Sequence, residues 1–301
     1  MKIDKQYGDV AFNEEFHKYW DVRKSDRKFI SVTTIIEEYA NKFDDVFWSR
    51  YKALERVRPK EFSLMKSDML RSHKIHVDLF GITEDELDAE VEKVRSEWKE
   101  ENLKSTTRGT AIHADKENGM YEAIGKGEMP LKKYGIGGKF ECIRNHSEMN
   151  LENGIYPEYL ISMDHTYKGV TVSIAGQIDL LIKEGNTIHI FDYKTNKKLD
   201  TKGFFDFKKK TTQKMLPPLG KLEDCNMSHY NLQLSLYMYM MLKANSGFKA
   251  GMLRIVHYSH DGEVNEYPLD YLEKDVVNLL NDYCRKVAKK DNDKKYEVIK
   301  F

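Results

Sequence analysis

Cysteine is scarce in this chain of 301 residues. Only Cys142, Cys225 and Cys284 are present, and no two of them form a Cys-x-x-Cys pair. Three thiols cannot complete a four-cysteine zinc or iron–sulfur site, so clusters of both kinds are excluded. Wide spacing of this kind is typical of inert, buried thiols in a reducing compartment, and we therefore expect a cytoplasmic location.

Long apolar runs and a phosphate loop are also missing, and we expect no signal peptide. No apolar run reaches the length of about 18 residues that a membrane span requires. Residues 1–7 contain no apolar core of the signal-peptide kind. The sequence has no Gly-x-x-x-x-Gly-Lys-Ser/Thr motif, which excludes a nucleotide-driven motor on this polypeptide. We therefore expect neither a nucleotide cofactor nor contact with a membrane.

Neither sign of charge is in excess. Lysine plus arginine and aspartate plus glutamate both total 49, so the formal net charge is zero. This balance argues against a broad phosphate-coating surface, although it leaves room for a local basic groove. The length suffices for one elaborate domain or two modest ones, with a substantial core that needs no disulfide.

Hydrophobic patterning predicts an α/β chain whose N-terminal part, residues 1–104, is mainly helical. A β-branched run over 29–36 predicts a strand that leads into a helix near 37–42. Further helices are predicted over 46–80, 83–104, 107–124, 139–152, 227–243 and 269–289. Strands are predicted over 156–163, 170–182, 187–193, 251–257 and 264–268, the first three as an antiparallel meander. A run of three lysines over 208–210, the Pro217-Pro218 pair and Gly220 predict a long loop over 200–226.

Two neighbouring predicted strands each carry an aspartate, Asp179 and Asp192, within apolar sequence. A carboxylate in such a strand is costly unless it is paired or bound to a metal ion. Residues two apart on a strand share a face, so Asp192 and Lys194 should project together while Tyr193 turns away. Two acids beside a lysine can bind a hard divalent cation and position a water molecule. The pattern therefore indicates phosphodiester hydrolysis.

Four motifs in this order resemble the PD-(D/E)XK nuclease superfamily and, within it, the RecB-like exonuclease branch. They are Arg108-Gly109-Thr110-x-x-His113, then Pro157-Glu158-Tyr159, then Gly176-x-x-Asp179 with Asp192-Tyr193-Lys194, and finally Gln233-x-x-x-Tyr237. Each motif alone arises easily by chance, whereas four in order over about 105–240 are specific. The resemblance implies a restriction-endonuclease-like α/β core over 105–301, in which helices carrying His113 and Gln233 flank a mixed central sheet.

The resemblance also implies a set of metal ligands and a catalytic lysine. One or two Mg²⁺ or Mn²⁺ ions are expected to be held by His113, Asp179, Asp192 and the backbone carbonyl of Tyr193. Lys194 is expected to orient the attacking water and to offset charge that develops on the phosphate. Glu158 is expected to hold a metal-bound water or a second ion, or else simply to pair with a lysine on a strand.

Substrate contacts are expected from Gln233, Tyr237 and Arg108. Gln233 and Tyr237 lie four residues apart on one helix face and should bond the substrate backbone or brace Lys194, although Tyr237 suits the core equally well. Arg108 is placed at a helix N-terminus, where it either grips a phosphate or is a plain surface arginine.

A basic stretch follows the second aspartate. Lys197, Lys198 and the run over 208–210 are expected to follow a nucleic-acid backbone. Phenylalanines 204, 205 and 207 interleave with these lysines, either to stack on unpaired bases or to anchor the loop to the core.

The expected function is that of a divalent-metal-dependent deoxyribonuclease. The simplest form is a stand-alone exonuclease of the phage, organellar or bacterial kind, acting on single-stranded DNA or duplex ends in recombination, repair or replication. Several RecB-like relatives carry an iron–sulfur cluster, which this chain cannot build. Alternatives are a structure-specific endonuclease and a catalytically silent nucleic-acid-binding module that works with a recombination or replication protein.

Overall fold

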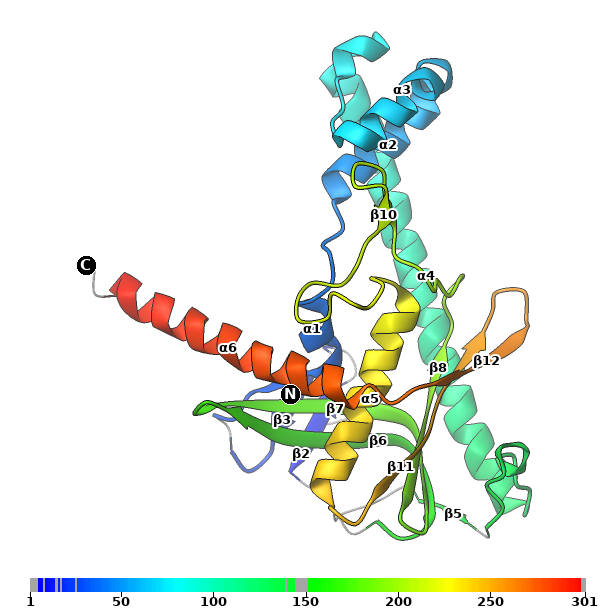
Figure 1. Ribbon diagram of the computed structural model, residues 1–301. Helices are drawn as coiled ribbons and strands as arrows, with labels where there is room; N and C mark the ends of the chain where they lie inside the picture. Colours follow the sequence, from blue (N-terminus) through cyan, green and yellow to red (C-terminus); the bar gives the residue numbers. More distant parts are fainter. Residues whose placement is uncertain are drawn as a thin grey trace.

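A helical arm and a sheet-based body share one long helix, α4 (Glu84–Gly125), as Figure 1 shows. The computed structural model describes residues 5–7, 9–13, 16, 18–24, 26–138, 140–143 and 151–298. Within those residues, no helix combines the length and the apolar character needed to cross a membrane.

A mixed sheet of seven strands forms the body. Its strands in spatial order are β12 (Val264–Leu269), β11 (Lys249–Tyr258), β8 (Thr187–Lys194), β7 (Val170–Glu184), β6 (Gly154–Tyr167) and β5 (Glu141–Cys142), with β4 (Phe29–Ser31) paired to β7. The predicted meander is confirmed, because β6, β7 and β8 pair antiparallel. Parallel pairing of β8 with β11 and of β4 with β7 makes the sheet mixed, as expected.

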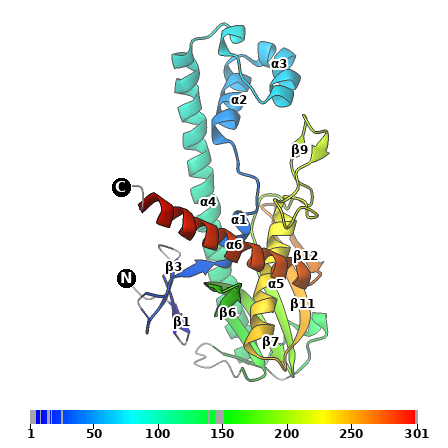
Figure 2. The ribbon, with the colours of Figure 1, turned by 60° about the vertical axis from the view of Figure 1, so that its left-hand side comes forward.

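Helices cover both faces of this sheet (Figure 2). On one face lie α1 (Val32–Glu37), α5 (Asn226–Ala244) and the start of α6 (Glu273–Val298). The other face packs against the lower part of α4 through Met120. Alternation along β7 supplies both cores, because Leu181 faces α5 while Leu180 and Ile182 face α4.

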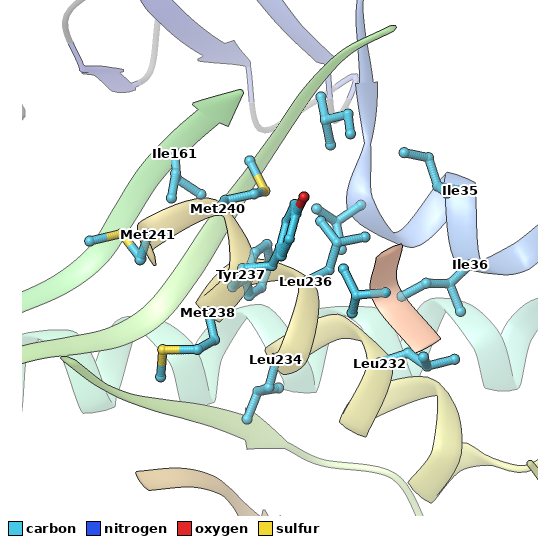
Figure 3. Close-up of a cluster of buried hydrophobic side chains, with 14 of the residues drawn as sticks. Ile35, Ile36, Ile161, Leu232, Leu234, Leu236, Tyr237, Met238, Met240 and Met241 are labelled. Atoms are coloured by element: carbon cyan, nitrogen blue, oxygen red, sulfur yellow. The ribbon is translucent and has the colours of Figure 1, made fainter. Parts of the chain in front are cut away.

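Helix α5 is enclosed on every side. Its residues 232–241 are all buried, since the sheet, α1 and α6 surround the helix. Figure 3 shows Tyr237 standing among Leu236 and Met240 of the same helix, with Ile35 of α1 nearby. This burial fixes the rotation of α5 and so determines which of its side chains face the sheet.

The arm has a hydrophobic core of its own. It consists of α2 (Asp45–Val57), α3 (Pro59–Ser72), the short helix η1 (Val77–Phe80) and the upper part of α4. Phe47, Leu54 and Leu87 are buried at its centre. The capped start predicted at Thr83 is confirmed, because Thr83 and Glu86 form a reciprocal capping box.

The structure corrects three predicted elements near the arm. Ser31 caps α1 by accepting the Thr34 N–H, so the strand predicted over 29–36 ends at Ser31. The helices predicted separately over 83–104 and 107–124 are one helix, α4. Thr106 and Thr107 do not interrupt it, because their hydroxyls donate to the carbonyls four residues earlier. The helical prediction over 46–80 holds, but it resolves into α2, α3 and η1.

Other corrections concern the remaining segments. The helix predicted over 139–152 is wrong at Glu141–Cys142, which forms β5, and its residues 144–150 lie outside the described ones. The last helix begins at Glu273, four residues later than predicted. The described residues before 22 form an antiparallel sheet that the sequence did not predict: β1 (Lys5–Tyr7), β2 (Val10–Asn13) and β3 (Lys18–Asp21). Helix α4 crosses residue 104, so a domain boundary there stays a prediction.

Contact between α5 and β7 depends on a glycine. A Cβ atom placed on Gly176 would lie 2.4 Å from Cε1 of Tyr237, and Tyr237 is buried. We predict that Gly176→Ala lowers the free energy of unfolding by about 1–3 kcal/mol, because an overpacked core must shift. The matched control is Gly119→Ala on α4, where a Cβ meets nothing within 4 Å. It should be neutral or stabilising by up to about 1 kcal/mol. Urea unfolding of both variants tests this, and equal stabilities would contradict it.

Candidate active site

Asp179 of β7 and Asp192 of β8 lie side by side where the ladder between the two strands ends. The last pair of that antiparallel ladder is Leu180 with Phe191, so the next residue on each strand is an aspartate and the two aspartates lie opposite each other. Both are buried, with exposed fractions of 8% and 2%. Oδ2 of Asp179 accepts the Tyr193 N–H at 2.6 Å. The carboxylate is thereby anchored to the backbone of β8 and held toward the second acid.

Lys194 projects beside Asp192, as the two-residue spacing predicted. Its Nζ lies 2.6 Å from Oδ2 of Asp192 and 4.5 Å from the centre of the Tyr230 ring of α5. The Tyr230 hydroxyl donates to Oδ1 of Asn196 at 2.7 Å, which fixes the ring. The ammonium group is therefore held by a carboxylate and by an aromatic face.

His113 reaches the two strands from α4. Its Nε2 lies 3.1 Å from the carbonyl oxygen of Tyr193, and its Nδ1 lies 3.6 Å from oxygens of both Glu158 and Asp179. Close packing of α4 permits this reach. One turn earlier, a Cβ on Gly109 would stand 3.4 Å from Oγ1 of Thr195, so a larger residue there would press against the end of β8.

Glu158 occupies an unusual backbone conformation on β6. Its φ is +53°, in the left-handed region that side chains other than glycine rarely adopt. Its neighbours Pro157 and Tyr159 both pair with β7, whereas Glu158 does not take part in the ladder. The side chain instead accepts a hydrogen bond from Gln177 and approaches His113. Strain of this kind is characteristic of functional positions.

Burial and charge shift the pKa values of the cluster. Burial, together with the charge of Asp192, raises the pKa of Asp179 to about 7. Burial alone would lower the pKa of His113, but the charges of Asp179 and Glu158 outweigh it and raise the pKa to about 9. The pKa of Lys194 is also raised, because Asp192 and Asp179 outweigh its burial. Lys194 is therefore a persistent cation.

The residues at this site fit a divalent cation. His113, Glu158 and Asp179 offer one ligand atom each, and these atoms lie within 4.8 Å of one another. Oδ1 of Asp192 is buried and accepts no hydrogen bond from the described part of the chain, a costly state that a cation would relieve. Carboxylate oxygens are the ligands that hard divalent cations prefer, and a neutral imidazole nitrogen can complete such a ligand set. Glu158, expected at a second ion or a water, thus lies in the same cluster as His113.

Arg108 is not at a helix N-terminus, so that prediction is wrong. It lies within α4, because the helix does not break before it. Its guanidinium donates to the carbonyl oxygens of Thr195, Tyr258 and Ser259. These bonds tie α4 to the ends of β8 and β11, so the guanidinium is occupied by backbone carbonyls.

The structure places the remaining predicted substrate contacts in two kinds of environment. Gln233 and Tyr237 are buried, and the Gln233 amide donates to the Tyr237 hydroxyl at 3.3 Å. Lys197 and Lys198 are exposed, with side-chain exposed fractions of 79% and 81%. Nζ of Lys198 pairs with Asp200 at 2.7 Å.

Three residues near the site were not foreseen: Tyr230, Gln177 and Tyr19. Tyr230 lies one helical turn before Gln233, so the i, i+3 spacing could have revealed it. Gln177 holds Glu158 only because a strained backbone turns the glutamate toward it. Burial, followed by the charges of Glu158 and Asp179, raises the pKa of Tyr19 on β3, so Tyr19 lies within the electrostatic range of these acids. No local pattern in the sequence signals that proximity.

Of three comparisons with known proteins, one identifies a family for this chain. None of the curated proteins compared with the chain matches it. Among solved structures, the chain resembles the crystal structure of SSO0001 at 13% identity, over 86% of this chain and 75% of that one, with a TM-score of 0.36. That similarity is too low to carry an argument. The family model of the PD-(D/E)XK nuclease superfamily matches residues 71–299. This span includes the acids, the lysine and the histidine, and the chain therefore belongs to the PD-(D/E)XK nuclease superfamily.

Proposed function

We propose that this protein is a divalent-metal-dependent deoxyribonuclease of the RecB-like branch, acting as an exonuclease on single strands or duplex ends. The observation that carries the proposal is the convergence of Asp179, Asp192 and Lys194 with His113 at one buried point. Membership of a nuclease superfamily supports phosphodiester hydrolysis. The order of the His113 and Gln233 motifs around the acids favours the RecB-like branch and, with it, an exonuclease in recombination, repair or replication.

The acidic residues form the half of the site that binds metal. His113, Glu158, Asp179 and Asp192, with the carbonyl of Tyr193, would hold one or two Mg²⁺ or Mn²⁺ ions. A bound ion supplies Lewis-acid stabilisation of charge on the phosphate and makes a water nucleophilic near neutral pH. The Tyr193 N–H keeps Asp179 aimed into the site, and Gln177 does the same for Glu158.

Lys194 acts as a cation rather than as a base. Its raised pKa keeps the ammonium protonated, so it can donate to a water or to a phosphate oxygen but cannot accept a proton. The Tyr230 ring and Asp192 limit its position, and a donor fixed before substrate binds requires little reorganisation during the reaction.

The decisive test is cleavage of end-labelled DNA with Mg²⁺ or Mn²⁺. We predict that Lys194→Ala and Asp179→Ala each lower the rate by about a hundredfold or more, because each removes a group that stabilises the transition state. Lys126→Ala is the matched control. Its ammonium is exposed at the far end of α4, away from the acids, and pairs with Glu122 at 3.8 Å, so the variant should keep most of the activity.

Substrate form separates the alternatives in the same assay. Loss of label from linear single strands or duplex ends, with closed circles intact, is the expected result. Cleavage of closed circles would show that the protein is an endonuclease rather than an exonuclease. DNA binding without any cleavage by the wild type would identify a catalytically silent module, and equal rates for wild type and Lys194→Ala would remove the proposed site.

Metal affinity should depend on pH. Below pH 7 both Asp179 and His113 carry protons in the metal-free site, since their pKa values are raised to about 7 and about 9. An incoming ion must displace these protons, so affinity for Mn²⁺ should rise from pH 6 to pH 9 and then level off. Calorimetric titration of the wild type and of Lys198→Ala should give the same rise, whereas His113→Ala should bind more weakly throughout. A pH-independent affinity would contradict the proposed ligands.

A further inference from the structure

A cavity of about 750 Å³ lies between the arm and the loop that follows β8. The loop carries a short hairpin, β9 (Phe205–Asp206) and β10 (Thr211–Thr212), which rises beside α2 in Figure 1. Phe204 meets Trp48 of α2 edge to face, with ring centres 5.3 Å apart. We call this cavity the arm cleft, and the residues that define it here are Phe43, Trp48, Phe204, Phe207, Lys42 and Lys208.

Aromatic rings in the arm cleft are exposed to an unusual degree. Phe43 is 65% exposed, Phe204 49% and Phe207 38%. Exposed apolar side chains that gather on one surface mark a binding site more often than isolated ones do. Phe43 is positioned edge to face against Trp98 of α4, with ring centres 5.8 Å apart, so its remaining surface is open to the cleft. The rings are thus held by the protein while their other surfaces stay accessible.

Cations in the arm cleft are available, whereas its acids are engaged by the protein. Within the described ranges, Lys42 and Lys208 form no ion pair. Asp44 caps α2 and pairs with a histidine, and Asp206 accepts two backbone N–H groups. Asp224 accepts hydrogen bonds from Asn41. The groups left to contact a ligand are therefore aromatic rings and lysine ammonium groups.

The arm cleft adjoins a further cavity that is lined by the segment following β8. A second cavity, of about 670 Å³, is lined by Lys198 and Lys202 and shares Phe204 and Asp224 with the first. Its lining begins four residues after Lys194. A strand that follows the two cavities would pass two lysines and then the exposed rings.

We propose that the arm cleft binds unpaired nucleotides of a single DNA strand whose end lies at the acids. Unpaired bases offer flat faces that stack on aromatic rings irrespective of sequence, and the intervening phosphates suit lysine. A duplex hides those faces, so the rings select single strands. The position of the strand's end at the acids rests on the proposed function. The binding of single strands in the arm cleft is a separate claim that can be tested independently.

Binding is therefore tested without cleavage, in full-length protein that carries Lys194→Ala. Fluorescence anisotropy with labelled oligothymidylates of about 4 to 16 nucleotides measures affinity. Phe43→Leu and Phe204→Leu keep apolar volume but remove the ring, and each should weaken binding by about tenfold or more. Leu64→Ala is the control, since Leu64 is 84% exposed on α3 and lies outside the arm cleft. It should leave affinity unchanged.

The outcomes separate this proposal from the nuclease assignment. Unchanged affinity in Phe43→Leu and Phe204→Leu, with unfolding midpoints equal to those of the parent, would overturn the arm cleft whether or not the wild type cleaves DNA. If the two ring variants bind single strands more weakly but the wild type cleaves no DNA, the arm cleft is upheld and the nuclease is rejected. A dimer in sedimentation that Phe43→Leu dissociates would show that a second copy covers the rings, and would also overturn the proposal.

Discussion

Two carboxylates buried at one point of the sheet determine how the rest of the molecule is arranged. Asp179 and Asp192 face each other across β7 and β8, where water cannot offset their charges. Such a pair persists only if cations approach it. Lys194 supplies one charge from the same strand, and His113 supplies a second from α4. A divalent ion is the third partner that this geometry favours, because imidazole and carboxylate oxygens already converge there.

Close approach of helices to the sheet brings these partners together. Gly109 lets α4 lie against the end of β8, which places His113 one turn away within reach of the acids. At Gly176 the restriction is stricter, because a Cβ there would lie 2.4 Å from Cε1 of Tyr237 on α5. Packing therefore requires glycine at position 176, whereas a Cβ at position 109 would make an ordinary van der Waals contact. The same two helices connect the site to the rest of the molecule. Helix α4 continues into the arm, and α5 carries the Tyr230 ring that contacts Lys194.

Sequence alone predicts what depends on neighbours in the chain. The acids, Lys194 and the three-stranded meander follow from strand periodicity, and the structure places them as that periodicity requires. Contacts between distant segments were not predictable. Arg108 looked like a residue at a helix start, but carbonyls far along the chain engage it within α4. The left-handed backbone of Glu158 and the electrostatic influence of the acids on Tyr19 likewise arise from tertiary packing, which leaves no local pattern.

Anomalous X-ray diffraction from crystals grown with Mn²⁺ tests the central claim most directly. A manganese peak in contact with Asp179 and His113, and weaker or absent in Asp179→Ala crystals, is the predicted result. It would show that the buried acids are a metal centre, independently of any assay with DNA. An empty cluster in crystals that bind Mn²⁺ elsewhere would contradict it, and the acids would then be a structural ion-pair network around Lys194.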